Sequence, residues 1–281
     1  MQSKFKLSFI AVMLAFSFGA HAHEAKKVGG LKSPESVAVA ADGKIYVSEI
    51  GEFGKDGDGQ ISVVDTDGTL SVFATGMDDP KGIYFSGKTL YVADNKRVLK
   101  VNPDGKWEVF AAADAFPVAP QFLNDVVVDE SGNVYVSDSG NLEGKGGAIY
   151  RIAKTGKVST VVDSSNKLVL GPNGLLMGPR GKLLEVDFVS GTLYSVNLKN
   201  GELEKMAEGL GAADGLVRRK TGEYYVSDWK GGKVSSVSKN GEVKLVKDGY
   251  MAAADIAFSA DGKYILVPDM KAGELAWLPV H

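Results

Sequence analysis

Six positions along the chain carry a polar residue near the start of an apolar, strand-like run. A packed strand would have apolar residues at such positions, and polar groups that converge on a narrow space need partners. One bound cation can serve as the partner of several oxygen atoms at once. In chain order, the six residues are Glu35, Lys81, Asn124, Asn173, Asp214 and Asp255.

The predicted ligands are four of these residues that carry side-chain oxygen atoms: Glu35, Asn124, Asn173 and Asp214. Their two carboxylates give a formal charge of −2. Such a set suits a hard divalent cation, with Ca²⁺ the first choice and Mg²⁺ or Mn²⁺ next, and with waters in the remaining positions. Zinc is disfavoured because the chain has no Cys and because His23 and His281 stand at the ends of the expected mature chain. The alternative is a metal-free ring of ion pairs, in which Lys81 neutralises Glu35.

A short pattern that occurs six times explains how these residues can meet. Each copy has an aromatic or aliphatic residue, Val, a small residue and an acid, as in Ile45–Glu49, Leu90–Asp94 and Val134–Asp138. The acids are Glu49, Asp94, Asp138, Asp187, Asp228 and Asp269, at intervals of 45, 44, 49, 41 and 41 residues. Their recurrence indicates that they cap the following turn by accepting hydrogen bonds from backbone N–H groups.

Each repeat contains four β-branched or aromatic runs separated by turn signals such as Asp42-Gly43, Asp67-Gly68 and Asn240-Gly241. Four short antiparallel strands at this period are typical of a β-propeller blade. The sequence therefore predicts an all-β, six-bladed propeller over residues 23–281. The last repeat supplies only three strands, over residues 255–259, 264–268 and 274–279. We expect residues 25–30 to complete the sixth blade and close the ring.

This architecture places the six polar residues at one mouth of the central channel, because each innermost strand starts just after the link from the previous blade. The link after the second strand returns to the same mouth. Two of these links, Ile50–Gly59 and Ser139–Gly147, are long and Gly-rich, and they are either walls of a site or tolerated insertions. Phe188, Trp229 and Met270 follow the last three acids and form either an apolar wall beside the cation or part of the core.

Residues 1–22 have the features of a secretory signal peptide. Lys4 and Lys6 precede an apolar run, Leu7–Gly19, and Ala20-His21-Ala22 supplies the small residues of a cleavage site. The run has 13 residues, fewer than the roughly 20 of a membrane-spanning helix, and no Cys follows for lipid attachment. We expect a protein exported to the periplasm or secreted, with no membrane insertion after cleavage.

Composition and charge exclude several classes of protein. With 44% hydrophobic residues, 24% charged residues and 35 glycines among 281 residues, the chain is neither disordered nor a coiled coil. Loss of the two lysines of the signal changes the formal net charge from −3 to −5, which favours neither nucleic acid nor anionic membrane as a partner. The absence of Cys excludes disulfides. A small-molecule substrate is expected, and no protein partner is indicated.

Three dipeptides in successive repeats carry a family resemblance: Asn124-Asp125, Asn173-Gly174 and Asp214-Gly215. Preceded by Glu35, they resemble the metal-ligand pattern of the regucalcin and gluconolactonase family. The resemblance covers essentially the whole mature chain and extends more distantly to diisopropyl fluorophosphatase and the paraoxonases. It implies a six-bladed propeller that holds a divalent cation in its channel and hydrolyses lactones.

The chain departs from the pattern of this family at three points. The family usually has Glu-Gly-Pro followed by Trp around its first ligand, whereas this chain reads Pro34-Glu35-Ser36-Val37. The substrate-binding Arg typical of regucalcin-like members is replaced by Phe122, and no His is available as a paraoxonase-type base. The resemblance therefore supports a metal site in this chain better than it supports specificity for sugar lactones.

From the resemblance we expect the cation to polarise the substrate carbonyl and to stabilise the oxyanion that forms when water attacks. Asp214 is the first choice for proton transfer, Asp255 the second, and Lys81 is expected to hydrogen-bond the oxyanion. The expected substrate-binding residues are Phe122, Phe188, Trp229 and Met270. The prediction is an exported, metal-dependent hydrolase of lactone or related ester bonds. The alternatives are a non-enzymatic propeller that binds a ligand or protein, and another reaction such as phosphotriester hydrolysis or a strictosidine-synthase-like condensation.

Overall fold

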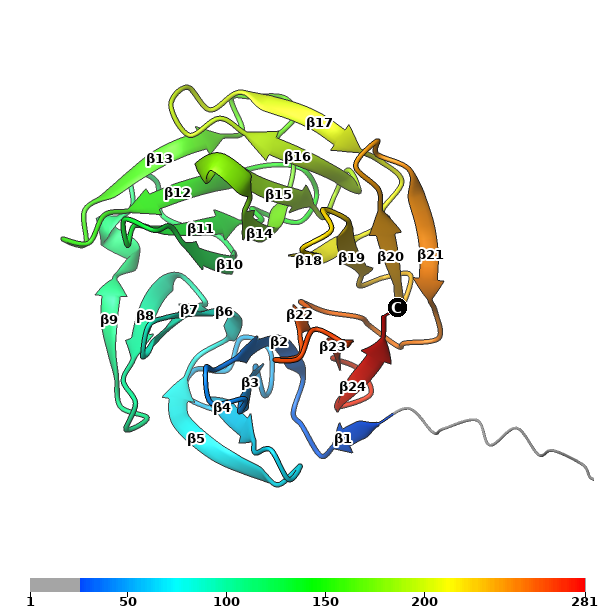
Figure 1. Cartoon of the computed structure of the whole chain (residues 1–281). Coiled ribbons are helices and arrows are strands. Elements are labelled where there is room, and N and C mark those ends of the chain that lie inside the picture. Colours follow the sequence, from blue (N-terminus) through cyan, green and yellow to red (C-terminus); the bar gives the residue numbers. More distant parts are fainter. Residues whose placement is uncertain (1–25, 281) are drawn as a thin grey trace, which may run out of the picture.

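Runs of Val, Ile, Leu and Tyr separated by glycine-containing turns fold into a ring of six β-sheets (Figure 1). The computed structural model of the chain describes residues 26–280, so the signal segment expected over residues 1–22 lies outside the described part. Each sheet has four antiparallel strands, which confirms the predicted six-bladed propeller. Within residues 26–280, no helix combines the length and the apolar character needed to cross a bilayer.

Blades 1 to 3 are numbered in chain order, and their strands run from the channel outward. Blade 1 consists of β2 (Pro34–Val39), β3 (Ile45–Glu49), β4 (Gly59–Val64) and β5 (Leu70–Met77). Blade 2 consists of β6 (Pro80–Ser86), β7 (Thr89–Asp94), β8 (Arg97–Val101) and β9 (Trp107–Ala111). Blade 3 follows a short 3-10 turn, η1 (Ala113–Ala115), and consists of β10 (Leu123–Val128), β11 (Val134–Asp138), β12 (Ala148–Ile152) and β13 (Val158–Asp163).

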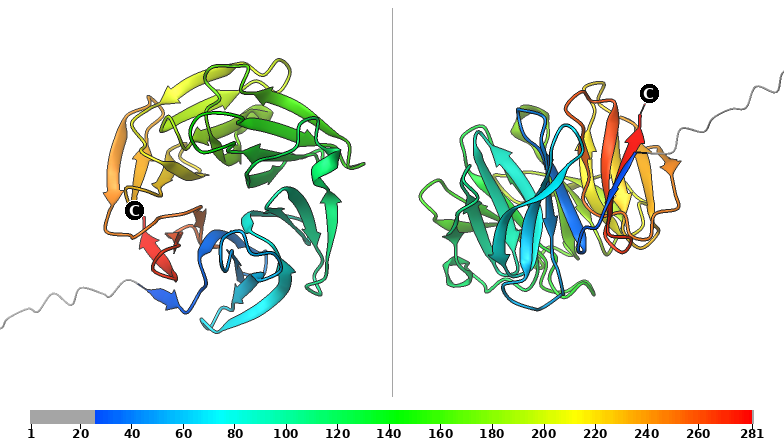
Figure 2. Two further views of the ribbon diagram at one scale, coloured as in Figure 1. Left: turned by 180° about the vertical axis from the view of Figure 1, so that it is seen from behind. Right: turned by 90° about the horizontal axis from the view of Figure 1, so that it is seen from below.

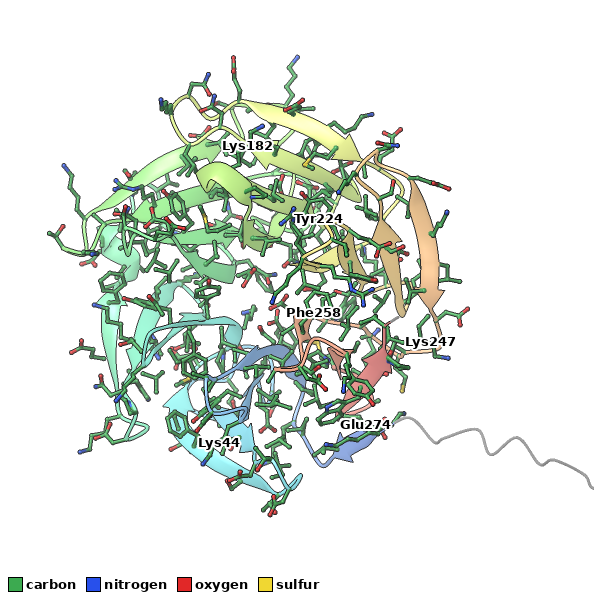
Figure 3. The ribbon with its side chains drawn as sticks, in the orientation of Figure 1. Lys44, Lys182, Tyr224, Lys247, Phe258 and Glu274 are labelled. Carbon is green, nitrogen blue, oxygen red and sulfur yellow. The ribbon has the colours of Figure 1, made fainter. Side chains whose placement is uncertain are left out.

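Blades 4 to 6 complete the ring. Blade 4 consists of β14 (Pro172–Met177), the turn η2 (Pro179–Gly181), β15 (Leu183–Asp187), β16 (Thr192–Val196) and β17 (Leu203–Ala207). Blade 5 consists of β18 (Ala213–Arg218), β19 (Tyr224–Asp228), β20 (Lys233–Val237) and β21 (Val243–Lys247). Blade 6 consists of β22 (Ala257–Phe258), β23 (Tyr264–Asp269), β24 (Glu274–Pro279) and β1 (Lys27–Gly29). Figure 3 shows Phe258 beside the central opening and Lys247 at the outer rim.

The ring closes with one strand from each end of the described chain. β1 pairs antiparallel with β24, with Lys27 opposite Ala276 and Gly29 opposite Glu274, and Figure 2 shows β1 in blue beside β24 in red. The ion pair between Lys27 and Glu274 (2.6 Å) is exposed and adds little to stability, so the backbone ladder closes the ring. The expected completion of the sixth blade by the N-terminal segment is confirmed.

The apolar core of the described residues is divided among the interfaces between neighbouring blades. In the second strand of each blade, the residue two positions before the final acid faces such an interface. Five blades have Val at this position, at most 1% exposed: Val47, Val92, Val136, Val226 and Val267. Blade 4 has Glu185 at this position.

Glu185 is a buried carboxyl group without a partner. The residue is 0% exposed, and neither of its carboxyl oxygens has a hydrogen-bond partner. Burial raises the pKa of Glu185 well above its usual range, and the charge of Asp187 raises it further. The interface between blades 3 and 4 therefore favours the neutral form of this group.

A β-bulge recurs in the innermost strand of blades 1 to 5, so that two consecutive residues stand opposite one. In blade 1, Glu35 and Ser36 both stand opposite Ser48. The Ser48 hydroxyl accepts a hydrogen bond from the backbone N–H of Ser36 (2.9 Å), and Ser137 and Ser227 accept equivalent bonds in blades 3 and 5. In these three blades, the serine of the repeated pattern thus satisfies a backbone N–H group of the bulge.

The second bulge residue is small or short because neighbouring innermost strands touch there: Ser36, Gly82, Asp125, Gly174 and Gly215. A Cβ atom on Gly82 would lie 2.4 Å from the Cα atom of Asp125. The Asp125 carboxylate turns toward blade 4 and accepts a hydrogen bond from the backbone N–H of Leu175 (2.6 Å). The first bulge residue is left free to extend into the channel.

The acid that ends each second strand accepts hydrogen bonds from the link that leads into the same blade. Asp187, for example, accepts bonds from the backbone N–H groups of Leu170 and Gly171, and from those of Val189 and Ser190 in the following turn. The predicted capping of the following turn is confirmed in blades 3 to 6. These hydrogen bonds also fix where the innermost strands begin, and they therefore fix the positions of the bulges.

We predict that Glu185→Val stabilises the protein. At pH 4 the gain is about 1–3 kcal/mol, because an unsatisfied buried polar group is removed. The gain is larger at pH 8. Since the folded-state pKa of Glu185 is raised, its stabilising protonation is fully present below the unfolded-state pKa and is lost as pH rises through the folded-state pKa. Urea unfolding at both pH values measures the effect.

Glu185→Gln is the matched control, because it removes the titration but keeps a buried polar group. The difference in stability between Glu185→Val and Glu185→Gln should be the same at both pH values, because neither side chain titrates, and Glu185→Gln should lack the gain at pH 4. A Val variant that is less stable than the parent at both pH values would contradict the assignment.

We predict that Gly82→Ala destabilises the protein by about 1–3 kcal/mol or more, because the added methyl group overlaps the Asp125 backbone. Gly29→Ala is the control, since a Cβ atom there would meet only Glu274 Cγ, at 3.9 Å. Thermal unfolding of both variants tests the proposed strand contact. Equal midpoints for the two variants would show that the strands can separate at no cost.

Candidate functional site

The first bulge residues of blades 1 to 5 meet in one cavity at a mouth of the channel. They are Glu35, Lys81, Asn124, Asn173 and Asp214, at most 5% exposed. The cavity has a volume of about 370 Å³, and its other lining residues are Phe53, Phe122, Leu142, Phe188, Trp229, Lys230 and Met270. Five of the six polar residues singled out in the sequence therefore converge from β2, β6, β10, β14 and β18.

Asp255 does not belong to this group, and its alignment with the other five residues is wrong. Ala253 bridges to Asp269 and Ala257 pairs with Leu266, so Ala254 takes the first bulge position and Asp255 the second. The sequence misleads because Ala254-Asp255 matches Ala213-Asp214 one residue out of register.

The Asp255 side chain lies deeper in the channel. Its Oδ2 atom accepts a hydrogen bond from the Ser36 hydroxyl (2.5 Å), which joins blade 6 to blade 1. Asp255 and Asp125 line a separate cavity of about 280 Å³. Because Asp255 does not line the cavity that contains Asp214, we do not assign it proton transfer.

Three of the four predicted cation ligands have a buried oxygen without a hydrogen-bond partner. These atoms are Glu35 Oε2, Asn173 Oδ1 and Asp214 Oδ1. Buried acceptors are normally paired, because an unsatisfied one costs about 1–3 kcal/mol. The fourth residue, Asn124, lines the same cavity. Convergence of free oxygens on one space is the condition that a bound cation requires.

The set of donors fits a hard cation. Throughout residues 26–280, no three His, Cys, Asp or Glu side chains are grouped so that they could hold a metal. At this cavity, two carboxylates are instead supplemented by the amide side chains of Asn124 and Asn173. Carboxylate and amide oxygens together suit Ca²⁺, and they suit Mg²⁺ or Mn²⁺ where waters complete the shell.

Lys81 extends into the cavity but is held by groups other than Glu35. Its Nζ atom donates a hydrogen bond to the carbonyl oxygen of Asp79 (3.2 Å) and lies 4.3 Å from the centre of the Phe122 ring. Glu35 Oε2 remains without a hydrogen-bond partner. The metal-free ring of ion pairs therefore accounts for part of the charge but not for the free oxygens.

Burial dominates the electrostatics of the site. It raises the pKa of Glu35 well above its usual range, and the neighbouring Asp214 and Asp255 carboxylates raise it further. Burial, followed by the charge of Asp255, likewise raises the pKa of Asp214. Burial lowers the pKa of Lys81 against the opposing charge of Glu35. A divalent cation would favour the ionised form of both carboxylates.

Apolar side chains surround this polar floor. All four predicted substrate-binding residues line the cavity: Phe122, Phe188, Trp229 and Met270. Met270 also packs against Ile50 and Ala254, so it serves the wall and the core together. Phe53, Leu142 and Lys230 also line the cavity but were not predicted from the sequence. Phe53 and Leu142 belong to the two long Gly-rich links, whose length was the available signal.

Solved structures with the same fold include enzymes and a calcium-binding protein. A gluconolactonase from Xanthomonas campestris matches with a TM-score of 0.73 and 16% identity, over 92% of this chain and 91% of its own. The calcium-binding protein regucalcin from Agrobacterium tumefaciens matches with a TM-score of 0.72 and 19% identity, over 89% and 90%. Virginiamycin B lyase from Staphylococcus aureus matches with a TM-score of 0.62 and 13% identity, over 92% and 99%. At these identities the likeness establishes the fold alone.

The sequence itself identifies the family. A search of curated protein sequences gave no match. The model of the SMP-30/gluconolactonase/LRE-like region, by contrast, matches residues 87–267, a range that includes Asn124, Asn173 and Asp214 and begins after Glu35. Since this range is more than half of the chain, the protein belongs to the SMP-30/gluconolactonase/LRE-like family.

Proposed function

We propose that this protein is an exported hydrolase of lactones or related esters that depends on a divalent cation. The observation that carries the proposal is the convergence of Glu35 Oε2, Asn173 Oδ1 and Asp214 Oδ1, all buried and unpartnered, on one cavity. Family membership supports the reaction class, because the family includes gluconolactonases. The signal features of residues 1–22 support export.

Glu35, Asn124, Asn173 and Asp214 would hold the cation, with Ca²⁺ the first choice and Mg²⁺ or Mn²⁺ next. A divalent cation bound there would supply Lewis-acid polarisation of the substrate's carbonyl group. The calcium-binding name of the regucalcin neighbour is consistent with this assignment.

Side chains of the protein supply proton transfer and stabilisation of the oxyanion. Asp214 accepts a proton from the water that adds to the carbonyl carbon, and returns it to the ring oxygen when the carbon–oxygen bond breaks, so that lactone and water give a hydroxy acid. The Lys81 ammonium donates a hydrogen bond to the oxyanion that forms. The aromatic wall limits the access of bulk water and strengthens both interactions.

We predict that the protein binds one Ca²⁺ per chain after treatment with a chelator, and that Asp214→Asn weakens the affinity about tenfold or more, because a formal charge is lost from the ligand set. Isothermal titration calorimetry measures both quantities. Asp255→Asn is the control, since Asp255 lines the other cavity. It should keep a stoichiometry of one and lose less affinity than Asp214→Asn, because the Asp255 charge acts on the ligands without lining their cavity. Equal affinities for the parent and Asp214→Asn, or no uptake by either, would count against the site.

We predict turnover of lactones or aryl esters in the presence of Ca²⁺, Mg²⁺ or Mn²⁺, and a loss of about 100-fold in kcat for Asp214→Asn. Lys81→Met should lower kcat to a similar extent while it leaves cation affinity in place, because an oxyanion donor is removed. Initial rates over a substrate panel provide the measurement.

A matched control for Lys81 is Lys100→Met. Lys100 also lies over an aromatic ring, Phe110 at 3.9 Å, but it belongs to β8 and does not line the cavity. This variant should retain the parent kcat. Absence of any rate above buffer for the parent protein would refute the reaction.

The second candidate is a non-enzymatic binding module. Phe53 is 54% exposed beside the cavity, and exposed aromatic residues are common in binding surfaces. The same assays separate the two functions, because a binding module would take up ligand without turnover.

A further inference from the structure

We infer that the substrate of this cavity carries an apolar alkyl or aryl group and is not a polyhydroxylated sugar lactone. The inference deepens the proposed function and rests on it for the reactive group. It follows from the wall of the cavity and from the two loops above it, whereas the proposed reaction follows from the floor.

The wall of the cavity is apolar on several sides. Its apolar side chains are Phe53, Phe122, Leu142, Phe188, Trp229 and Met270. The polar residues Glu35, Asn124, Asn173 and Asp214 lie together on the innermost strands, at the floor. A ligand that reaches the floor with its carbonyl group must therefore place the rest of its surface against rings and methyl groups, which favours an apolar body.

The wall offers few polar groups to a ligand. Trp229 Nε1 donates to the sulfur atom of Met270 (3.4 Å), and Lys230 Nζ lies 5.2 Å from the centre of the Phe188 ring. Lys81 Nζ, which contacts Asp79 O and the Phe122 ring, is assigned to the oxyanion of the reacting carbonyl group. Free oxygens lie only at the floor, where they are assigned to the cation. Most hydroxyl groups of a sugar lactone would lie against the wall, where they would lose water without gaining partners, and unpaired polar groups are a strong basis for rejection.

Phe53 and Leu142 are placed at the entrance by loops with defined structure. They are 54% and 37% exposed and also line the cavity, so their apolar surfaces are accessible to a ligand that enters it. Leu142 has a φ of 60°, a left-handed conformation that a leucine rarely adopts. The conformation is fixed by hydrogen bonds from Leu142 N to Ser139 O (3.3 Å) and from Asn141 N to Lys145 O (2.9 Å). Backbone strain that holds an apolar side chain at a cavity mouth indicates a ligand contact.

The test uses δ-lactams, which are ring amides that resist hydrolysis, so binding is measured without turnover. Lactams with a propyl, pentyl or heptyl chain are compared with glucono-δ-lactam by calorimetry in the presence of Ca²⁺. We expect affinity to rise with chain length, by up to about fourfold for each buried methylene, and glucono-δ-lactam to bind more weakly than the heptyl compound by at least about tenfold.

Leu142→Asn tests the entrance without endangering the fold, because Asn adopts positive φ more readily than Leu. It should weaken binding of the heptyl lactam several-fold and leave glucono-δ-lactam unchanged. Phe53→Ser should act in the same direction. Leu168→Asn is the matched control, since Leu168 is 43% exposed but does not line the cavity.

Three results would overturn the inference: tighter binding of glucono-δ-lactam than of the alkyl lactams, no binding of any alkyl lactam, or equal effects of Leu142→Asn and Leu168→Asn. These results are distinguishable from failure of the proposed function. If the protein binds the heptyl lactam but hydrolyses no ester, the inferred apolar ligand is supported and the proposed hydrolysis is refuted. If the protein hydrolyses only sugar lactones, the proposed hydrolysis is supported and the inferred apolar ligand is refuted.

Discussion

Neighbouring innermost strands touch through their backbones near the axis, and the shape of the cavity follows from that contact. A Cβ atom on Gly174 would lie 2.2 Å from the carbonyl oxygen of Asp214, so blade 4 can approach blade 5 only with glycine at that position. The residue just before it, Asn173, is then free to point at the cavity. Packing and chemistry therefore occupy adjacent positions of one bulge. A shift of a single residue exchanges the two roles, as Asp255 demonstrates.

Buried acids in this protein fall into two groups that a pKa alone does not separate. Burial raises the pKa of Glu185 and that of Asp214 alike. Glu185 lies in a buried interface between blades, and the residues at the equivalent positions of the other five blades are valines. Asp214 lies at the floor of a cavity with other free oxygens. The space beside the group, and the groups that share that space, mark Asp214 as the candidate for function.

The fold could be predicted from the sequence because it depends on a period. The interval between acids such as Asp94 and Asp138 reflects one four-stranded blade, and the missing strand of the last repeat indicated closure by the N-terminal segment. The site could be predicted in part, since a polar residue at the start of an apolar strand is conspicuous. Asp255 was misplaced because the bulge register depends on pairing with a strand that follows it, which local sequence does not reveal.

Loop residues at the entrance were beyond the reach of the sequence pattern. The length of Ser139–Gly147 marked the loop as notable, but the position of Leu142 depends on a backbone conformation that is set by contacts within the folded loop. Glu185 was not singled out in the sequence. Its burial becomes apparent only when blades 3 and 4 are packed together.

The pairing of β1 with β24 also sets an order of events during synthesis. Among the described strands, β1 is synthesised first, and it can pair with β24 only after that strand, the last one, has been synthesised. Blades 1 to 5 contain all their own strands and can assemble earlier, whereas blade 6 stays incomplete until Glu274–Pro279 has been made. A nascent chain that stops short of that segment leaves a gap in the circle with unpaired edges on both sides. The ring can therefore close only in a chain that includes β24.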